Sequence, residues 1–270
     1  MPEFVRAGAR LHYELRGSGA PLIALHGFTG GGRDFLPLAN ALRRQAMTIT
    51  LDLMGHGESD APADPGRYSL AASADDVLAL ADELGLTSFD LLGYSMGGRV
   101  ALRTVLAQPR RIRRLVLESA SPGIRDPQER QRRRESDLAL ARTIDEEGLP
   151  AFVDRWLRQD LFRTLRMLPA SQQAALREEK LRQRPEGLAR SLRGAGAGED
   201  EDVWGRLGEI RGRVLLIGGM EDRKYGAILS QMAERMPDAR LVRVPRVGHT
   251  VHLERPRLFA AYVAEFLRQP

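Results

Sequence analysis

Short apolar runs alternate with amphipathic segments along most of the chain. Near its start, two runs of alternating apolar and polar residues, 4–7 and 10–15, meet at Gly8 and predict an antiparallel hairpin. From Pro21 onward, apolar runs of strand length are separated by segments with apolar residues at spacings of three and four. Strands are expected near residues 21–27, 47–53, 88–94, 114–119, 214–219 and 239–244, and helices near 35–44, 70–84, after Ser95, after 214–219 and at 257–267. This alternation predicts an α/β fold with a mostly parallel sheet flanked by helices.

One long segment, between residues 121 and 213, interrupts this alternation. Its charged and apolar residues recur mainly at helical spacings, and Asp126, Pro127 and Glu129 form the pattern of a helix N-terminus. The stretch G-A-G-A-G-E-D-E-D, residues 194–202, is typical of a flexible return to the sheet. The segment is therefore interpreted as a helical insertion.

The insertion divides the chain into three parts. We expect the first part of an α/β core at 1–121, a helical lid at 122–203 and the second part of the core at 204–270. Open parallel sheets bind ligands at the carboxyl ends of their strands. A lid over that edge would therefore cover the binding site.

A serine lies between glycines where a predicted strand becomes a predicted helix. The residues Gly93-Tyr94-Ser95-Met96-Gly97 match G-x-S-x-G. A sharp strand-to-helix turn needs neighbours without side chains, and it lifts the serine hydroxyl above the sheet at a helix N-terminus. The pentapeptide alone also fits a purely structural turn, whereas its context favours a catalytic serine at Ser95.

A base and an orienting acid for this serine follow later in the chain. In this architecture the order is serine, acid, histidine. Asp222 follows the predicted strand at 214–219, and His249 follows the strand at 239–244. Both side chains are expected at the same sheet edge as Ser95. Glu118 and Glu221 are alternative acids. If Asp222 and His249 have no catalytic role, Asp222 would be the cap of the following helix and His249 a histidine in a loop.

The loop after the first parallel strand, H-G-F-T-G, is a candidate oxyanion-binding element. In this architecture one backbone donor comes from that loop and the second from the residue after the nucleophile. These donors would be the N–H groups of Phe28 and Met96. His26 and His56 are interpreted as structural residues of turns.

Composition narrows the function classes. The net charge is +5, and Lys180 and Lys224 are the only lysines among 41 basic residues, so the surface is arginine-rich without a nucleic-acid motif. The absence of cysteine excludes disulfides and thiolate catalysis, and His12 and His252 lack metal-ligand spacing. We therefore expect no metal, no cofactor and no nucleic-acid partner. Without a signal-peptide pattern or a membrane-length apolar run, we expect a cytoplasmic protein with no membrane partner.

The order of these motifs resembles that of the α/β-hydrolase superfamily over essentially the whole chain. H-G-F-T-G, D-L-M-G-H-G-E-S, G-Y-S-M-G-G and G-G-M-E-D with V-G-H stand in the order of that superfamily. L-E-S-A-S-P-G-I, R-R-R-E-S-D, F-V-D-R-W and V-G-H-T-V-H are more specific. Together they look like the 2-succinyl-6-hydroxy-2,4-cyclohexadiene-1-carboxylate (SHCHC) synthases of menaquinone biosynthesis. The resemblance implies an α/β-hydrolase fold with an inserted helical lid.

This resemblance implies a carbon–oxygen lyase that eliminates pyruvate from a small anionic substrate with three carboxylates, 2-succinyl-5-enolpyruvyl-6-hydroxy-3-cyclohexene-1-carboxylate. The substrate-binding arginines of the SHCHC synthases align with Arg99, Arg133 and Arg182, and other pocket residues align with Tyr94 and Trp156. Independently, Arg99 lies one helical turn after Ser95 on the same face. Arg130, Arg133 and Arg134 share a helix face by spacing, so the inward position of Arg133 is implied by the resemblance alone.

Two other functions share these sequence features. A carboxylester or carbon–carbon bond hydrolase would use the same three residues with an apolar pocket in place of the arginines. A non-catalytic ligand receptor could keep the fold and even the triad. The sequence leaves the oligomeric state open.

Overall fold

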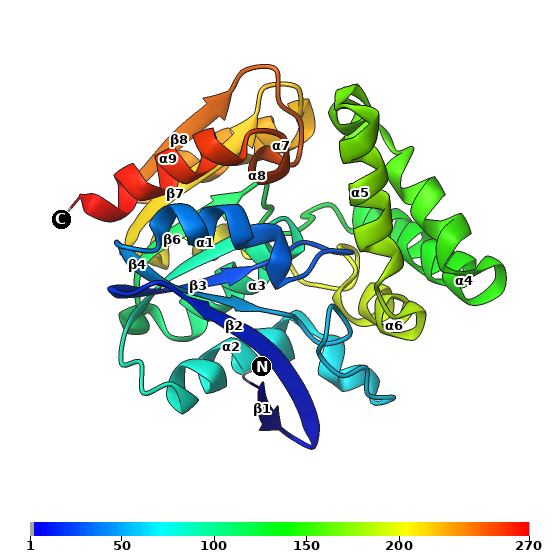
Figure 1. Cartoon of the computed structure of the whole chain (residues 1–270), viewed down its shortest axis with the longest axis horizontal. Helices are drawn as coiled ribbons and strands as arrows, with labels where there is room; N and C mark the ends of the chain where they lie inside the picture. Colours follow the sequence, from blue (N-terminus) through cyan, green and yellow to red (C-terminus); the bar gives the residue numbers. More distant parts are fainter. Residues whose placement is uncertain (1–2, 270) are drawn as a thin grey trace.

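An eight-stranded sheet forms the centre of the computed structural model, which describes residues 3–269 (Figure 1). The strand order is β1-β2-β4-β3-β5-β6-β7-β8. The pairs β1–β2 and β2–β4 are antiparallel, and the other pairs are parallel. The predicted hairpin and mostly parallel sheet are confirmed. The strands are β1 (Glu3–Arg6), β2 (Ala9–Arg16), β3 (Ala20–Leu25), β4 (Ala46–Leu51), β5 (Phe89–Tyr94), β6 (Ile112–Glu118), β7 (Arg213–Gly219) and β8 (Ala239–Val244).

Helices cover both faces of the sheet because buried side chains alternate along the central strands. Leu91 and Leu115 face one apolar cluster, which α2, α3 and α7 complete, whereas Leu92 and Val116 face a second cluster with α1, α8 and α9. The helices are α1 (Leu36–Leu42), α2 (Leu70–Glu83), α3 (Met96–Ala107), α7 (Arg223–Ala233), α8 (Val251–Glu254) and α9 (Pro256–Arg268), with short 3-10 turns η1 (Gly32–Phe35), η2 (Pro65–Tyr68), η3 (Pro109–Arg111) and η5 (Trp204–Glu209). This layering confirms the predicted α/β architecture.

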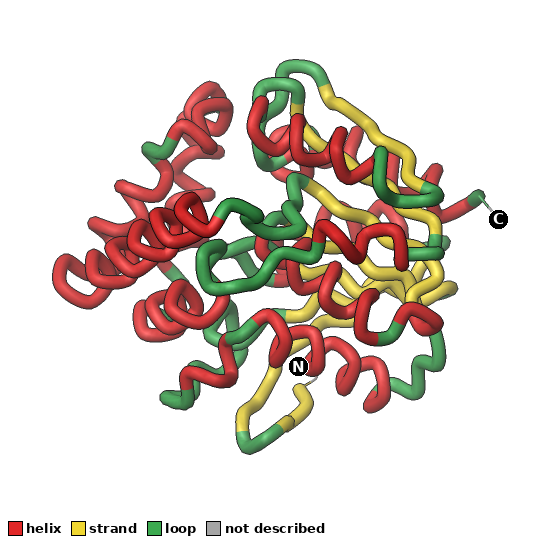
Figure 2. Tube along the Cα trace, turned by 180° about the vertical axis from the view of Figure 1, so that it is seen from behind, coloured by secondary structure: helices red, strands yellow, loops and turns green. Residues whose placement is uncertain are grey.

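The segment between β6 and β7 forms a separate helical group beside the sheet (Figures 1 and 2). It contains α4 (Pro127–Leu157), η4 (Asp160–Met167), α5 (Ala170–Leu181) and α6 (Pro185–Ala195). Helix α4 is interrupted at Gly148, whose φ of 84° lies in the left-handed region that favours glycine. The group has its own apolar cluster, which includes Phe152, Leu165 and Leu188. The domain boundaries at 121/122 and 203/204 stay a prediction.

The insertion begins as the sequence predicts. Pro127 is the first residue of α4, and the Asp126 carboxylate accepts a hydrogen bond from the Glu129 N–H at 2.7 Å. This is the expected N-cap, which satisfies one of the free donors of the first turn.

The return from the insertion is anchored to its surroundings. Arg103 of α3 forms a salt bridge with Asp200 at 2.7 Å, and Arg134 of α4 forms one with Glu199 at 2.7 Å. Glycine and acidic residues alone suggest a flexible segment, but these acidic side chains have arginine partners that are distant in sequence. The 194–202 stretch thus ties the insertion to α3.

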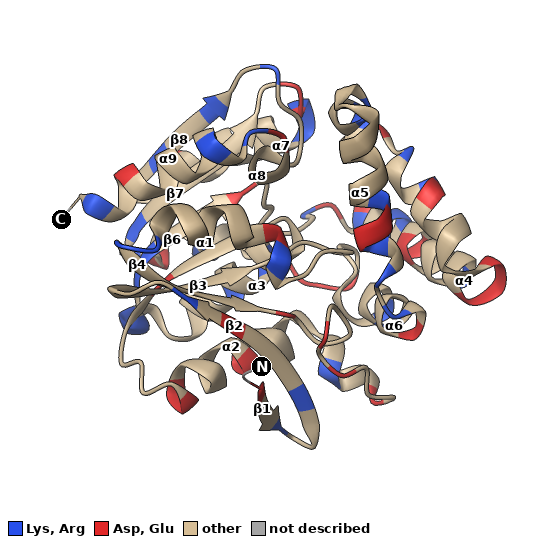
Figure 3. Ribbon diagram, viewed as in Figure 1, with Lys and Arg blue, Asp and Glu red and all other residues tan. Residues whose placement is uncertain are grey.

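Charges of both signs are interspersed over the helices and strands in the view of Figure 3. Many of the arginines form salt bridges, so much of the arginine charge is locally compensated. Within residues 3–269, no helix combines the length and apolar character needed to cross a membrane.

Candidate active site

Ser95 occupies a strained turn between β5 and α3. Its φ of 50° and ψ of −107° are unusual for a residue with a side chain. The turn is closely packed, because a Cβ atom at Gly97 would lie 2.3 Å from the carbonyl oxygen of Leu25. The Ser95 N–H donates to the carbonyl of Glu118 at 2.9 Å, which fixes the turn to the end of β6. A Cβ atom at Gly93 would likewise lie 2.4 Å from the carbonyl oxygen of Gly97, so close contact requires both glycines of G-x-S-x-G.

Ser95, His249 and Asp222 form a continuous hydrogen-bonded chain. His249 Nε2 lies 3.0 Å from Ser95 Oγ, and His249 Nδ1 lies 2.6 Å from Asp222 Oδ2. An ionised carboxylate only accepts hydrogen bonds, so Nδ1 carries the proton and Nε2 is free to accept from the serine hydroxyl. This arrangement can withdraw the Ser95 proton, which is the chemistry that the sequence motifs predict.

The two alternative acids are engaged elsewhere. Glu221 is exposed and forms a salt bridge with Arg163 at 3.1 Å. Glu118 is fully buried, but its carboxylate pairs with Nδ1 of His252 at 2.9 Å and leaves His249 to Asp222. The geometry therefore distinguishes Asp222 from both alternatives.

The backbone N–H groups of Phe28 and Met96 are free to act as anion donors. Both residues line the same cavity as Ser95, and within residues 3–269 neither N–H donates to a protein acceptor. Met96 is the first residue of α3, where N–H groups lack intrahelical partners and the helix dipole favours negative charge. Their role as an oxyanion hole remains a prediction.

The histidines of the neighbouring loops are structural. His26 Nδ1 lies 2.7 Å from the Gly27 carbonyl, and its Nε2 accepts the Leu53 N–H at 3.0 Å. This neutral tautomer ties the Phe28 loop to the loop after β4. Burial lowers the pKa of His56 to about 3, and its ring packs against Phe28 with centroids 5.7 Å apart.

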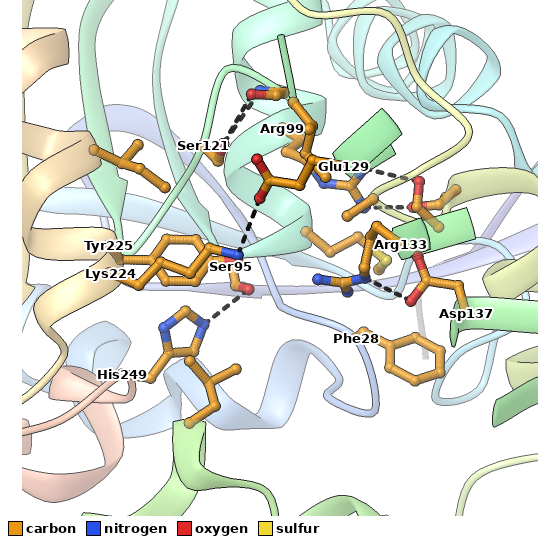
Figure 4. A pocket seen from close by; sticks show the side chains of 18 of the residues that line it. Phe28, Ser95, Arg99, Ser121, Glu129, Arg133, Asp137, Lys224, Tyr225 and His249 are labelled. Carbon is orange, nitrogen blue, oxygen red and sulfur yellow. Dashed lines mark hydrogen bonds and ion pairs between the residues drawn. The ribbon is translucent and has the colours of Figure 1, made fainter. Parts of the chain in front are cut away.

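A cavity of about 410 Å³ opens beside Ser95, between the strand ends and the insertion (Figure 4). Its lining includes four of the residues that the resemblance implies: Tyr94, Arg99, Arg133 and Trp156. Trp156 is buried, and its Nε1 donor has no partner among residues 3–269. An unpaired buried donor costs free energy that a polar ligand group can recover.

Arg99 and Arg133 place two positive charges in this cavity. Arg99 donates to the carbonyls of Ala195 and Gly196 at the end of α6, and Arg133 pairs with Asp137 at 2.8 Å. Burial, and next the charge of Arg133, lower the pKa of Arg99. Burial disfavours the Arg133 charge, but the Asp137 carboxylate outweighs it and raises the pKa of Arg133. The repulsion between the two guanidinium groups makes the cavity favourable for anions.

Arg182 lies apart from this cavity. It follows the last residue of α5, its side chain is exposed, and it forms a salt bridge with Glu179 at 3.2 Å. The motif alignment for this position crosses a segment of variable length, and here Arg182 points to solvent. The geometry gives no support to Arg182 as a substrate ligand.

Several residues near Ser95 were not predicted from the sequence. Lys224 and Tyr225 line the cavity, and the Tyr225 ring centroid lies 4.5 Å from that of His249. Their position directly after Asp222, in the first turn of α7, could have indicated that they lie near the triad. The Glu118–His252 pair lies behind Tyr94, whose ring is 4.5 Å from His252 and 5.5 Å from His249. Only the tertiary structure could pair residues so distant in sequence.

Comparison with known proteins identifies the family. Residues 20–256 match the family described as the alpha/beta hydrolase fold. The chain is 41% identical over 246 residues to the provisionally named SHCHC synthase of Bacillus subtilis (strain 168), across 91% of this chain and 89% of that protein. The chain belongs to the SHCHC synthase branch of the α/β-hydrolase family.

Other members of this branch are similar over nearly their full length. The SHCHC synthase of Enterobacter sp. (strain 638) is 29% identical over 92% of this chain and 91% of that protein. The solved structure of MenH from S. aureus has a TM-score of 0.91 and 32% identity, and the match covers 95% of this chain and 98% of that one. An enol-lactonase from Burkholderia xenovorans LB400, 24% identical with a TM-score of 0.83, shares the fold.

Proposed function

We propose that this protein is a lyase that eliminates pyruvate from 2-succinyl-5-enolpyruvyl-6-hydroxy-3-cyclohexene-1-carboxylate and yields SHCHC, a step of menaquinone biosynthesis. The observation that carries this proposal is the serine–histidine–aspartate chain opening into a cavity with two adjacent arginines. The names of the relatives described above give the product, SHCHC, and the substrate is the one that the resemblance to the SHCHC synthases implies. A substrate with three carboxylates matches the positive charge of Arg99 and Arg133.

In the proposed mechanism the triad abstracts a proton from carbon. His249, oriented by Asp222, accepts the Ser95 hydroxyl proton, and the serine oxygen removes the ring hydrogen next to the succinyl ketone. The electron pair moves through the ring alkene and breaks the carbon–oxygen bond to the enolpyruvyl group. The leaving enolate takes up a proton and becomes pyruvate. No water is consumed and no acyl-enzyme forms.

Groups that line the cavity would stabilise the charges that develop in these reaction steps. The Phe28 and Met96 N–H groups would donate to the ketone oxygen as negative charge develops on it. Arg99 and Arg133 would hold substrate carboxylates by charge-assisted hydrogen bonds. The α4–α6 insertion would act as a lid that limits water access, which strengthens these interactions.

The test is to incubate the purified protein with the enolpyruvyl substrate and follow pyruvate and diene absorbance together. We expect pyruvate and diene in equal amounts. A protein that releases no pyruvate but hydrolyses esters would instead be a hydrolase of the same fold. A protein that binds the substrate without turnover would be a receptor.

A further inference from the structure

The Asp222 carboxylate connects the triad to the start of α7. Its Oδ2 atom contacts His249, whereas its Oδ1 atom accepts the Tyr225 N–H at 3.2 Å and caps the helix. The same side chain thus fixes the catalytic imidazole and the first turn of α7. This arrangement holds the Tyr225 ring against His249, with the ring planes 59° apart.

The Tyr225 hydroxyl lies among the cationic groups of the cavity. It is within hydrogen-bonding reach of the Arg133 guanidinium, and Arg99 also lies close enough to interact with it electrostatically. A guanidinium group can only donate, so in a contact between these two groups the phenol oxygen is the acceptor. The phenolic proton is then available for another acceptor.

Among residues 3–269, no group accepts a hydrogen bond from this hydroxyl. Asp222 and Asp137 also act on the Tyr225 hydroxyl electrostatically. Asp222 is engaged by His249 and by the Tyr225 N–H, and Asp137 is engaged by Arg133 through Oδ1, whereas its buried Oδ2 has no hydrogen-bond partner among the described residues, Tyr225 included. Tyr225 lines the cavity together with Ser95 and the two arginines (Figure 4). The available proton therefore belongs to a side chain that borders the substrate space.

We propose that the Tyr225 hydroxyl is a specificity-determining donor that, together with Arg99 and Arg133, binds one carboxylate of an organic di- or tricarboxylate. This inference rests on the proposed function for its substrate, but the subsite itself is defined by its three donors. A hydrogen bond from Arg133 polarises the phenol and makes it a stronger donor to an anion. A planar guanidinium and a rigid phenol also restrict the orientation of the carboxylate more than two arginines alone.

Tyr225 remains protonated in the working range of such an enzyme. Burial raises the pKa of Tyr225, whereas the charges of Arg133 and Arg99 oppose that shift. The raised pKa keeps the phenol a neutral donor at neutral pH. It can therefore bind an anion without adding a second negative charge to the cavity.

The test compares wild type with Tyr225→Phe and with a control, Tyr13→Phe. Phenylalanine keeps the ring against His249 and removes only the hydroxyl. Tyr13 is buried on β2 and lies outside the lining of the cavity, so its variant controls for the loss of a tyrosine hydroxyl elsewhere in the fold. Binding of 2-succinylbenzoate, an unreactive dicarboxylate, is measured by calorimetry, and kcat and KM are measured with the enolpyruvyl substrate.

We expect Tyr225→Phe to weaken 2-succinylbenzoate binding by roughly 10- to 100-fold, the range for a hydrogen bond to a charged group, and to lower kcat/KM to a similar extent. Tyr13→Phe should match wild type in both measurements. A cooperative thermal unfolding transition in each variant would show that the variant is folded.

Binding and turnover by Tyr225→Phe within twofold of wild type would overturn the inference, as would a wild type that fails to bind 2-succinylbenzoate. The proposed function fails separately. If wild type binds the probe but releases no pyruvate, a weakened Tyr225→Phe complex still supports the donor. If wild type releases pyruvate and Tyr225→Phe is unaffected, the lyase stands and the donor does not.

A double variant provides a second measurement. If Arg133 polarises the phenol, Tyr225→Phe should cost less affinity for 2-succinylbenzoate in an Arg133→Ala background than in wild type. Equal costs in the two backgrounds would contradict the coupling between the two residues.

Discussion

His249 Nδ1 lies 2.6 Å from Asp222 Oδ2, and both side chains are buried. Because both side chains are buried, their hydrogen bond is shielded from competition by solvent. The pair therefore holds one tautomer of His249, with Nε2 directed at Ser95. The predicted effects of substitution follow from this geometry.

Replacement of Ser95 or His249 by alanine should reduce kcat by roughly three or more orders of magnitude. The double variant should be little worse than either single variant, because the two residues act as one unit in proton abstraction. Pyruvate release under saturating substrate is the measurement. Near-normal elimination by Ser95→Ala would mean that another group is the base.

Asp222→Asn should lower kcat by roughly 10²- to 10⁴-fold, no more than the loss of Ser95. The amide can donate to Nδ1, which favours the imidazole tautomer that cannot accept the serine proton. Its oxygen can still cap Tyr225, so the fold should be retained. Circular dichroism and kcat measured on the same sample separate these effects, and unchanged kcat would contradict the orienting role.

Arg99→Ala should affect the anionic substrate more than a neutral one. Loss of a charge-assisted contact in a partly dry pocket should cost about 2 to 5 kcal/mol in kcat/KM for pyruvate elimination. A small neutral ester such as p-nitrophenyl acetate has no carboxylate for Arg99 to bind, so any slow hydrolysis of it should change little. Arg133→Ala should show the same asymmetry.

Arg99 also has structural partners, the carbonyls of Ala195 and Gly196. Arg99→Ala should therefore also lower the melting temperature, and Arg99→Lys should restore only part of the activity because an ammonium group lacks the bidentate geometry. Equal losses on the anionic and neutral substrates would show that Arg99 acts only by supporting α6.

The Glu118–His252 pair should make stability depend on pH. Burial disfavours the imidazolium, but the attraction and hydrogen bond of Glu118 outweigh it and raise the pKa of His252. Asp34 adds to this rise and Lys180 opposes it. A raised folded-state pKa contributes stability that is fully present below the unfolded value of about 6.5 and is lost as the pH rises through the folded value.

Glu118→Gln tests this dependence. It should lower the free energy of unfolding by about 1 to 3 kcal/mol at pH 6 and by less at pH 9. The quantity to compare is the difference in the free energy of unfolding between wild type and variant, because the other titratable groups are the same in both proteins. Urea unfolding at a series of pH values is the measurement, and a difference that is constant from pH 6 to pH 9 would contradict a charged His252.

Arg182→Ala should leave kcat/KM within about twofold of wild type, because surface substitutions usually have small effects. The residue is exposed and paired with Glu179, outside the lining of the cavity. Arg133→Ala is the matched comparison from α4. A loss comparable to that of Arg133→Ala would mean that α5 moves Arg182 into the site when substrate binds.

Periodicity in the sequence predicts the fold because the spacing of apolar residues within a segment reflects which of its side chains are buried. A strand with two buried faces produces a continuous apolar run, and a covering helix produces spacings of three and four, so each strand and helix expected in the core is found near its predicted residues. The return segment at 194–202 is different. Its composition suggests flexibility, and only the distant partners of its acidic residues, such as Arg103, hold it in place.

The sequence by itself determined the position of Ser95, since its glycines and its strand-to-helix context are local, and it determined the order in which Asp222 and His249 follow. The tertiary structure decided which acid pairs with which histidine, that Arg133 borders the cavity while Arg182 points to solvent, and that Tyr225 lies beside both arginines. The physical reason is that helical spacing shows which residues share one face of a helix, but not which part of the protein that face packs against. This is set by packing of the insertion against the core.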